Sequence, residues 1–328
     1  MKFYLHLLVV LCVFASCSGG PNGDPVPEPP VLPPVILPDT LSTGWAAAVA
    51  PSKEVYGDIF FAENNTGYLV GEATVYKSTN GGLTWAKLFS TNSGFSHMAA
   101  GNANNICFVD PVSLRIFNSQ NGGNSIDSSI RIASGDQGFY DAFFSSANTC
   151  YVSGNTTIRK STDGGVNFTT VYNFTNNQTL FSSLFFIDDM NGFILRDRAI
   201  YKTTNGGADW TKIRDVNLTR PQAIQFLNAS TGFYSDDYTL WKTTDGGTSW
   251  TKIYEIAAGV GTAFNDMAFI DGNTGYFVAG NLVVKTTDGG THWEPVIRAG
   301  NRIVEIHFTD PAHGWACGFD GKVFVYRP

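Results

Sequence analysis

The chain contains 328 residues with a formal net charge of −7; 15% of the residues are charged, 14% are aromatic and 35 are glycine. This length fits one large all-β unit or two ordinary domains, and aromatic bulk with glycine-rich turns is typical of many short strands joined tightly. Eight of the eleven lysines recur at two fixed positions of a sequence repeat: Lys77, Lys160, Lys202, Lys242 and Lys285 at one, and Lys87, Lys212 and Lys252 at the other. Basic residues are therefore dispersed rather than gathered on one face, which argues against a nucleic-acid partner.

The N-terminal segment predicts a secreted, lipid-anchored protein. Lys2 precedes an apolar run at 3–15 that is short for a permanent membrane span and typical of a signal peptide, which we assign to residues 1–16. The small residues before Cys17 resemble the lipobox of bacterial lipoproteins, although Phe14 replaces the usual leucine. That resemblance implies lipidation of Cys17, membrane attachment through the lipid alone, and a location in the bacterial cell envelope, either facing the periplasm or at the cell surface. An ordinary signal peptide cut nearby is the alternative.

Residues 17–40 are predicted to be the lipidated cysteine and a tether. The stretch 18–39, SGGPNGDPVPEPPVLPPVILPD, holds eight of the fourteen prolines and has little core-forming pattern. Such a segment favours extended polyproline conformations of ~3 Å per residue. A binding motif for a proline-recognising partner is the alternative to a simple spacer.

From residue 41 to 328 one turn sequence recurs, which we call the box: S/T-x-D/N-G-G-x-x-aromatic. Complete copies lie at 78–85, 161–168, 203–210, 243–250 and 286–293, with a worn copy at 119–126, and their starts are 40 to 43 residues apart. A period near 40 residues with four short strands per unit predicts the blades of a β-propeller.

A second landmark, an aromatic residue at the start of a strand, recurs seven times: Tyr68, Phe108, Tyr151, Phe193, Phe233, Tyr276 and Trp315. The extra unit lacks a box, but Trp45 lies forty residues before Trp85. We therefore expect an all-β, seven-bladed propeller of four-stranded blades in which an N-terminal strand completes the last blade and removes an exposed edge. Six blades is the alternative if residues 41–55 do not form a strand.

The box places Asp or Asn before Gly-Gly, where glycine supplies the positive φ of a tight turn and the Asp or Asn side chain accepts hydrogen bonds from turn amides. It resembles the Asp-box, or BNR, repeat of sialidases, xyloglucanases, sortilin-type propellers and photosystem II stability/assembly factor-like proteins, and it is closest to the last two groups. The resemblance covers residues 42–328. It implies a structural role for Asn80, Asp163, Asn205, Asp245, Asp288, Trp85, Trp210, Trp250 and Trp293.

The alternative to a structural role of the box is metal binding by Asp163, Asp245 and Asp288. One carboxylate per turn, about 40 residues from the next, forms no convergent ligand set, so we expect no metal and no other cofactor.

Whether the protein is an enzyme is not decided by the sequence, but its motifs favour a protein without catalytic activity. The Phe/Tyr-Arg-Ile-Pro motif of sialidases is absent, and IRIA at 130–133 is the nearest string. Xyloglucanases resemble this chain in blade type but use two propellers. Glycoside hydrolysis needs two carboxylates ~5–9.5 Å apart. Asp236, Asp237 and Asp266 are the candidates, but the adjacent pair would point to opposite sides of a strand.

Cys107 and Cys150 each precede a landmark aromatic residue, which places them at equivalent positions of neighbouring blades. Packed sheets lie ~10 Å apart, whereas a disulfide requires Cα atoms within ~7 Å. We therefore expect both, together with Cys317, to be small buried apolar residues.

Function is expected among residues that the repeat does not require, on the face that carries the loops between second and third strands and those that link consecutive blades. The candidate partner-binding residues are Arg196, Arg198, Arg220, Asp236, Asp237, Tyr238, Asp266 and Arg302. Arginine with tyrosine is common at protein-binding hot spots; the alternative is that these charges pair with one another or are only solvated. We expect a non-catalytic envelope scaffold that binds a protein. A surface glycan-binding protein or a glycoside hydrolase is the alternative.

Overall fold

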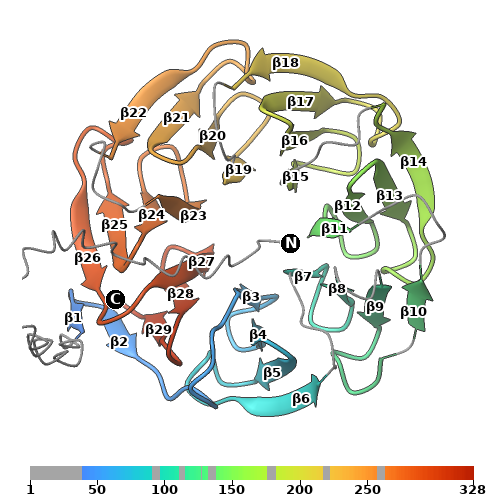
Figure 1. Cartoon of the computed structure of the whole chain (residues 1–328). Coiled ribbons are helices and arrows are strands. Elements are labelled where there is room, and N and C mark those ends of the chain that lie inside the picture. Colours follow the sequence, from blue (N-terminus) through green and yellow to red (C-terminus); the bar gives the residue numbers. More distant parts are fainter. Residues whose placement is uncertain are drawn as a thin grey trace, which may run out of the picture.

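The computed structural model describes residues 39–90, 97–110, 115–126, 128–131, 138–175, 182–216, 222–256 and 263–328. They form seven antiparallel sheets set as blades around a central axis (Figure 1), so the predicted seven-bladed β-propeller is confirmed. No helix within the described ranges is long and apolar enough to cross a membrane. The predicted signal peptide, Cys17 and all but the last two residues of the predicted tether lie outside these ranges.

The first three blades follow one another along the chain, each with its first strand nearest the axis (Figure 1). Blade 1 contains β3 (Asp58–Phe61), β4 (Gly67–Val70), β5 (Thr74–Ser78) and β6 (Ala86–Ser90). Blade 2 contains β7 (His97–Ala100), β8 (Ile106–Asp110), β9 (Arg115–Ser119) and β10 (Ser128–Arg131). Blade 3 contains β11 (Phe139–Phe144), β12 (Cys150–Gly154), β13 (Thr157–Ser161) and β14 (Thr169–Asn173).

The next three blades repeat this order. Blade 4 contains β15 (Ser182–Phe186), β16 (Gly192–Arg196), β17 (Ala199–Thr203) and β18 (Thr211–Asp215). Blade 5 contains β19 (Ala223–Phe226), β20 (Gly232–Ser235), β21 (Thr239–Thr243) and β22 (Thr251–Glu255). Blade 6 contains β23 (Phe264–Phe269), β24 (Gly275–Ala279), β25 (Leu282–Thr286) and β26 (Glu294–Arg298).

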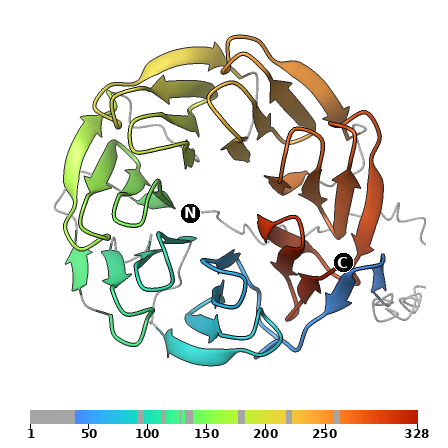
Figure 2. The same ribbon diagram turned by 180° about the vertical axis from the view of Figure 1, so that it is seen from behind.

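Blade 7 joins the two ends of the described chain. It contains β27 (Ile303–Asp310), β28 (His313–Gly318) and β29 (Val323–Tyr326), and its outer strand is β2 (Trp45–Ala47). Trp45 lies opposite Tyr326, so the predicted closing strand is confirmed. Both views of the ring show the N-terminal strands beside the last blades (Figures 1 and 2).

The sequence did not predict a second N-terminal strand. β1 (Thr40–Leu41) pairs with β26 and makes blade 6 five-stranded. The carboxylate of Asp39 also accepts hydrogen bonds from the Gly300 amide at 2.7 Å and from Lys322 Nζ at 2.8 Å. The segment leading into β2 is therefore held by blades 6 and 7 together.

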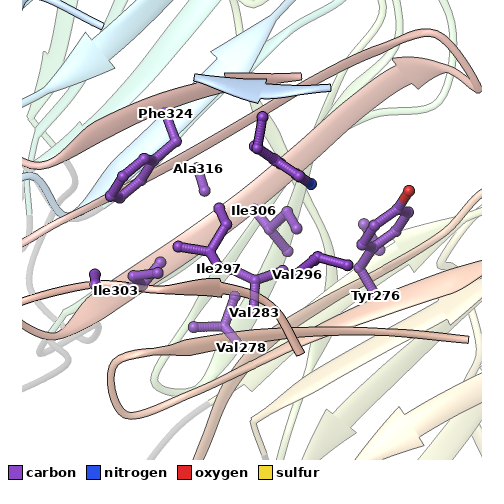
Figure 3. Packing of buried hydrophobic residues seen from close by; sticks show 12 residues of the cluster. Tyr276, Val278, Val283, Val296, Ile297, Ile303, Ile306, Ala316 and Phe324 are labelled. Carbon is purple, nitrogen blue, oxygen red and sulfur yellow. The ribbon is translucent and has the colours of Figure 1, made fainter. Parts of the chain in front are cut away.

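Seven buried hydrophobic clusters lie at the junctions between neighbouring blades, one at each junction of the described ring. At the junction of blades 6 and 7, Val278, Val283 and Ile297 meet Ile306 and Phe324 (Figure 3). The propeller is thus held together by sheet-on-sheet packing, as expected for strands that are apolar on both faces.

An aromatic stack recurs at five junctions. The landmark aromatic residue of one blade stacks on the last phenylalanine of the next blade's inner strand, with ring centroids 3.4 to 4.5 Å apart: Trp315–Phe61, Tyr151–Phe186, Phe193–Phe226, Phe233–Phe269 and Tyr276–Phe308. These stacks explain why an aromatic residue recurs at the start of the second strand.

The recurrent lysines have a structural role that the sequence did not show. Lys77 lies 5.7 Å from the Tyr68 ring centroid and donates to the carbonyl of Gly122 in the next blade at 2.8 Å. Lys242 lies over Phe233 and donates to Gly272 in the same manner. These ammonium groups connect neighbouring blades, which accounts for their even distribution around the ring.

Candidate functional site

The box turns lie on one face of the ring, which we call the box face, and they are held by one hydrogen-bond pattern. In the first box, Ser78 Oγ accepts from the Gly82 amide at 2.9 Å and donates to Asn80 Oδ1, which accepts from the Thr84 amide. The same pattern recurs around Asn121, Asp163, Asn205, Asp245 and Asp288. The Asp and Asn side chains therefore organise their own turns.

The carboxylates of the box are stabilised in their charged form by this pattern. Hydrogen bonds from the hydroxyl and amide of Ser249 and the hydroxyl of Thr243 lower the pKa of Asp245 to about 2. Bonds from the amide and ring of His292 hold the pKa of Asp288 well below its usual range. Across the described ranges, no three His, Cys, Asp or Glu side chains gather into a potential metal site.

The box tryptophans pack at the junctions. Trp210, Trp250 and Trp293 each donate the indole N–H to the carbonyl of the second box glycine, at 3.0 to 3.1 Å. All four, Trp85 included, pack edge-on to the last phenylalanine of the inner strand in their own blade, with ring centroids 5.8 to 6.3 Å apart. The aromatic position of the box thus fixes the outer strand against its own turn.

The opposite face carries the loops between second and third strands, and we call it the loop face; its described loops include 71–73, 155–156, 197–198, 236–238, 280–281 and 319–322. Of the candidate partner-binding residues, Arg220 lies outside the described ranges. The remaining seven differ sharply in exposure and in what they contact.

Arg196 is buried at the end of β16, with no exposed surface. Its guanidinium lies 3.5 Å from the centroid of the Phe174 ring, Nε donates to Asp197 Oδ2 at 2.8 Å, and Nη2 donates to the Asn155 carbonyl at 3.1 Å. Phe174 and Asn155 belong to blade 3, so Arg196 connects blades 3 and 4. Its side chain does not reach the surface in this structure.

Arg198 is exposed and lies on a strained turn. Asp197 and Arg198 adopt φ values of 51° and 60°, a left-handed conformation that aspartate tolerates but that strains the backbone at arginine. The Arg198 carbonyl accepts from the Val216 amide at 2.7 Å, which fixes the backbone of the turn against the end of the outer strand.

Tyr238 occupies the corresponding position in blade 5, since its carbonyl accepts from Ile256 as that of Arg198 does from Val216. Its side chain is 44% exposed. Asp236 is buried beneath it: Oδ1 accepts from the amides of Tyr238 and Thr239 at 3.0 and 2.7 Å, and Oδ2 accepts from the Trp241 indole at 2.9 Å.

Asp237 is also buried and accepts from Gln222 Nε2 at 3.2 Å. The two aspartates thus build the loop that presents Tyr238. The sequence pattern predicted that Asp236 and Asp237 lie within a strand. In the structure β20 ends at Ser235, and both aspartates lie in the loop that follows.

Asp266 makes a hydrogen bond between the inner strands of neighbouring blades, which the sequence pattern did not predict. Its Oδ2 accepts from the Ile306 amide of the next blade at 3.0 Å. Asp58 and Asp141 accept from Met98 and Leu184 in the same way, at 2.8 and 2.7 Å. An aspartate recurring near the start of inner strands was the available signal.

Arg302 is exposed on the loop that joins blades 6 and 7. It donates to Asn265 Oδ1 and lies 5.8 Å from the Phe319 ring centroid. The structure therefore divides the described candidates into three groups: the buried Arg196, Asp236 and Asp237, which shape the loops; the part-buried Asp266, which joins inner strands; and the exposed Arg198, Tyr238 and Arg302. We call Arg198 and Tyr238 the Arg198–Tyr238 pair.

No protein-family model matches the chain, and a search of curated proteins finds no significant match. Solved structures share the fold. The structure described as YCF48 bound to D1 peptide has a TM-score of 0.71 and 17% identity over 89% of this chain and 99% of that one. The structure of YCF48 from Cyanidioschyzon merolae has a TM-score of 0.71 and 20% identity over 87% of this chain and 99% of that one.

A glycoside hydrolase is also similar. The GH74 enzyme of Niastella koreensis gives a TM-score of 0.68 and 16% identity over 86% of this chain and 53% of that one, so this chain spans about half of that enzyme. At such identities the likeness shows the fold alone, and the class that it defines is the seven-bladed β-propeller.

Proposed function

We propose that this protein is a non-catalytic propeller scaffold of the Asp-box type, anchored to the bacterial envelope by a lipid on Cys17, which binds a protein partner through its loop face. The observation that carries the proposal is the Arg198–Tyr238 pair, exposed at matching positions of neighbouring blades on loops with fixed backbones. Arginine and tyrosine dominate protein-binding hot spots, and a preorganised loop loses less entropy on binding.

The structural comparisons are compatible with this role. A propeller of the same fold is described as bound to a peptide, and this chain covers 99% of that propeller. Arg302 extends the exposed surface toward blades 6 and 7, while Asp236, Asp237 and Arg196 support it from beneath. Arg220 stays a proposed contact.

The test of the binding face uses residues 39–328, which include every described strand. The double variant Arg198→Gly/Tyr238→Ala removes both exposed side chains, and glycine suits the positive φ of residue 198. The matched control, Lys212→Ala/Lys252→Ala, removes two exposed rim side chains of the same blades, which pair with Asp215 and Glu255.

Each protein is immobilised and incubated with solubilised native envelope. We expect one protein to be captured by the wild type and by the control, and its yield to fall about 10-fold or more with the double variant. Equal capture by the folded double variant would overturn the proposed face. Folding is checked by circular dichroism.

Glycan binding or hydrolysis is the second candidate, favoured by the similarity to a GH74 enzyme. Asp236, Asp237 and Asp266 all accept hydrogen bonds from the protein itself, which is the arrangement of structural carboxylates. Binding to a glycan array that survives the Arg198→Gly/Tyr238→Ala change, or release of sugars from xyloglucan, would favour this candidate.

The anchor has a separate test. Cells that express the full chain are labelled with an alkyne fatty acid. The label is expected on the wild type and not on Cys17→Ser, because a lipoprotein carries its acyl chains on that cysteine. An unlabelled wild-type protein, cut elsewhere, would support the ordinary signal peptide.

A further inference from the structure

The junction of blades 2 and 3 is not among the five at which the aromatic stack recurs. In blade 3 the landmark Tyr151 lies opposite Lys160, and in blade 2 the residue in that register is Cys107, opposite Asn118. The sequence pattern predicted Phe108 at this position. Phe108 instead belongs to the cluster between blades 1 and 2.

Cys150 occupies a different register position from Cys107. In five blades a glycine of the second strand lies opposite the last phenylalanine of the inner strand, and a Cβ there would come within 2.3 to 2.6 Å of that ring: Gly67, Gly192, Gly232, Gly275 and Gly314. Cys150 takes this position in blade 3, opposite Phe144. The prediction of equivalent positions, and of the wide spacing that follows from it, is therefore wrong.

This offset brings the two thiols together. At the five stacked junctions an aromatic ring of one blade lies on the phenylalanine of the next; here Cys107 shares one cluster with Phe144 and Cys150. Both cysteines are fully buried, which raises the pKa of the Cys150 thiol, and Cys107 is close enough to raise it further. The Cys150 Sγ donates to the Tyr151 carbonyl at 3.8 Å. Both are free thiols in this structure. The ring of Phe144 is displaced and lies over Gly101.

We propose that Cys107 and Cys150 form a disulfide across the junction of blades 2 and 3 when the chain folds in the presence of a disulfide oxidant. One thiolate attacks a sulfur of the external disulfide, which releases one thiol and leaves a mixed disulfide. The second thiolate then attacks the protein sulfur and displaces the other thiol. The two protein thiols are oxidised, and the external disulfide is reduced to two thiols that take up the two protons.

Burial determines when this exchange occurs. The thiolate is the reactive form, and burial, together with the hydrogen bond and charge of Cys107, raises the pKa of the Cys150 thiol. Exchange is therefore slow in the folded ring and fast while the junction is still open. Once formed, the bond is shielded from reductants by the same packing.

The experiment uses the full chain, unfolded with reductant and refolded with a mixture of reduced and oxidised glutathione. Free thiols are alkylated, and the protein is digested with trypsin without reduction. The lysines and arginines place Cys107 and Cys150 in separate peptides, 88–115 and 132–159. We expect these peptides to be linked, with a mass about 2 Da below their sum.

The linked pair is expected to vanish in Cys107→Ser and in Cys150→Ser and to persist in the control Cys317→Ser, which changes the buried cysteine of blade 7. The linked protein should melt about 5 °C above the protein refolded with reductant, and Cys317→Ser should keep this shift. Folded wild-type protein with both peptides alkylated would overturn the proposal, and this result depends on no variant. The readout is independent of cellular location and of any binding partner.

Discussion

The two faces of the ring are stabilised in different ways. On the box face one arrangement of hydroxyl, carboxylate or amide, and paired glycines is used six times. On the loop face four described loops share one backbone bond, from the residue after the outer strand to the carbonyl of Thr156, Arg198, Tyr238 or Asn281. Their side-chain supports differ: a buried guanidinium supports the turn at Asp197, whereas a buried carboxylate supports the turn before Tyr238. The comparison separates residues that the repeat requires from residues that it leaves free to vary.

This difference locates function better than charge does. Arg196 and Arg198 are two positions apart, yet one is fully buried and the other is exposed. If the loop face is specialised, changes at its supports should destabilise the protein strongly, changes at its exposed side chains should affect binding alone, and changes in one box should be moderate.

The largest effect is expected at Arg196. Arg196→Met keeps an apolar contact with Phe174 but leaves the Asp197 carboxylate, whose side chain is 10% exposed, without its guanidinium. Removing one partner of a buried ion pair should lower the free energy of unfolding by about 3 kcal/mol, measured by urea titration. Asp197→Asn in the same chain should restore part of this loss. An effect as small as that of the exposed Lys252→Met control would contradict the supporting role.

Disrupting a single box turn should lower the free energy of unfolding by less than the loss of Arg196 does. Thr243→Val keeps the shape of the side chain but removes the oxygen that accepts from the buried Gly247 amide at 3.0 Å. An unsatisfied buried amide should lower stability by about 1.5 kcal/mol in thermal or urea unfolding. Thr251→Val, at the exposed start of β22, is the control, expected within about 0.5 kcal/mol of wild type. Equal effects at the two threonines would refute the importance of the box hydroxyl.

A change at Arg198 should raise the free energy of unfolding, in contrast to the two preceding variants, which should lower it. Arg198→Gly relieves the positive φ of this turn, and the gain exceeds the entropy that glycine adds to the unfolded chain. We expect the free energy of unfolding of this variant to be about 0.5 kcal/mol higher than that of wild type, and its capture of the partner to be weaker. Arg198→Val should be less stable than wild type, because a β-branched residue is poorly accommodated at positive φ. A stabilised valine variant would show that the turn is not strained.

The smallest effect is acid dependence in one box. The folded pKa of Asp245 is about 2, below its ordinary value of 3.8, so its contribution to stability is complete above pH 3.8 and is lost as the pH falls toward 2. The stability difference between wild type and Asp245→Asn should therefore narrow over this range in pH-dependent melting. Asn80→Asp, in the first box, should gain the same acid dependence. A constant difference would contradict the assignment.

Much of the fold could be predicted because repetition amplifies weak signals. Seven landmark aromatic residues against six boxes, with Trp45 one period before Trp85, identified the closing strand. β1 was not predictable, because two residues carry no periodicity. The landmark in blade 2 was misplaced by one residue because Phe108 matches the pattern better than Cys107, whose role appears only when its register against Asn118 is known.

The candidate site was harder to predict for a physical reason. Sequence position indicates which loop a residue belongs to, but not whether its side chain turns inward. Asp236 and Tyr238 lie in the same loop, and only hydrogen bonds to nearby amides and the Trp241 indole draw the carboxylate beneath the surface. Likewise, nothing in the local sequence around Arg196 shows that Phe174 of another blade provides a stacking surface.

The closing strand has a consequence for the order of events during synthesis. Asp39 and Lys322, which form an ion pair at the junction, are 283 positions apart along the chain. A growing chain therefore exposes β2 long before β29 leaves the ribosome, and loop closure over such a distance is slow. Until then the edge of β29's partner strand is unpaired, so the incomplete ring is the stage at which the newly made chain is most prone to aggregate.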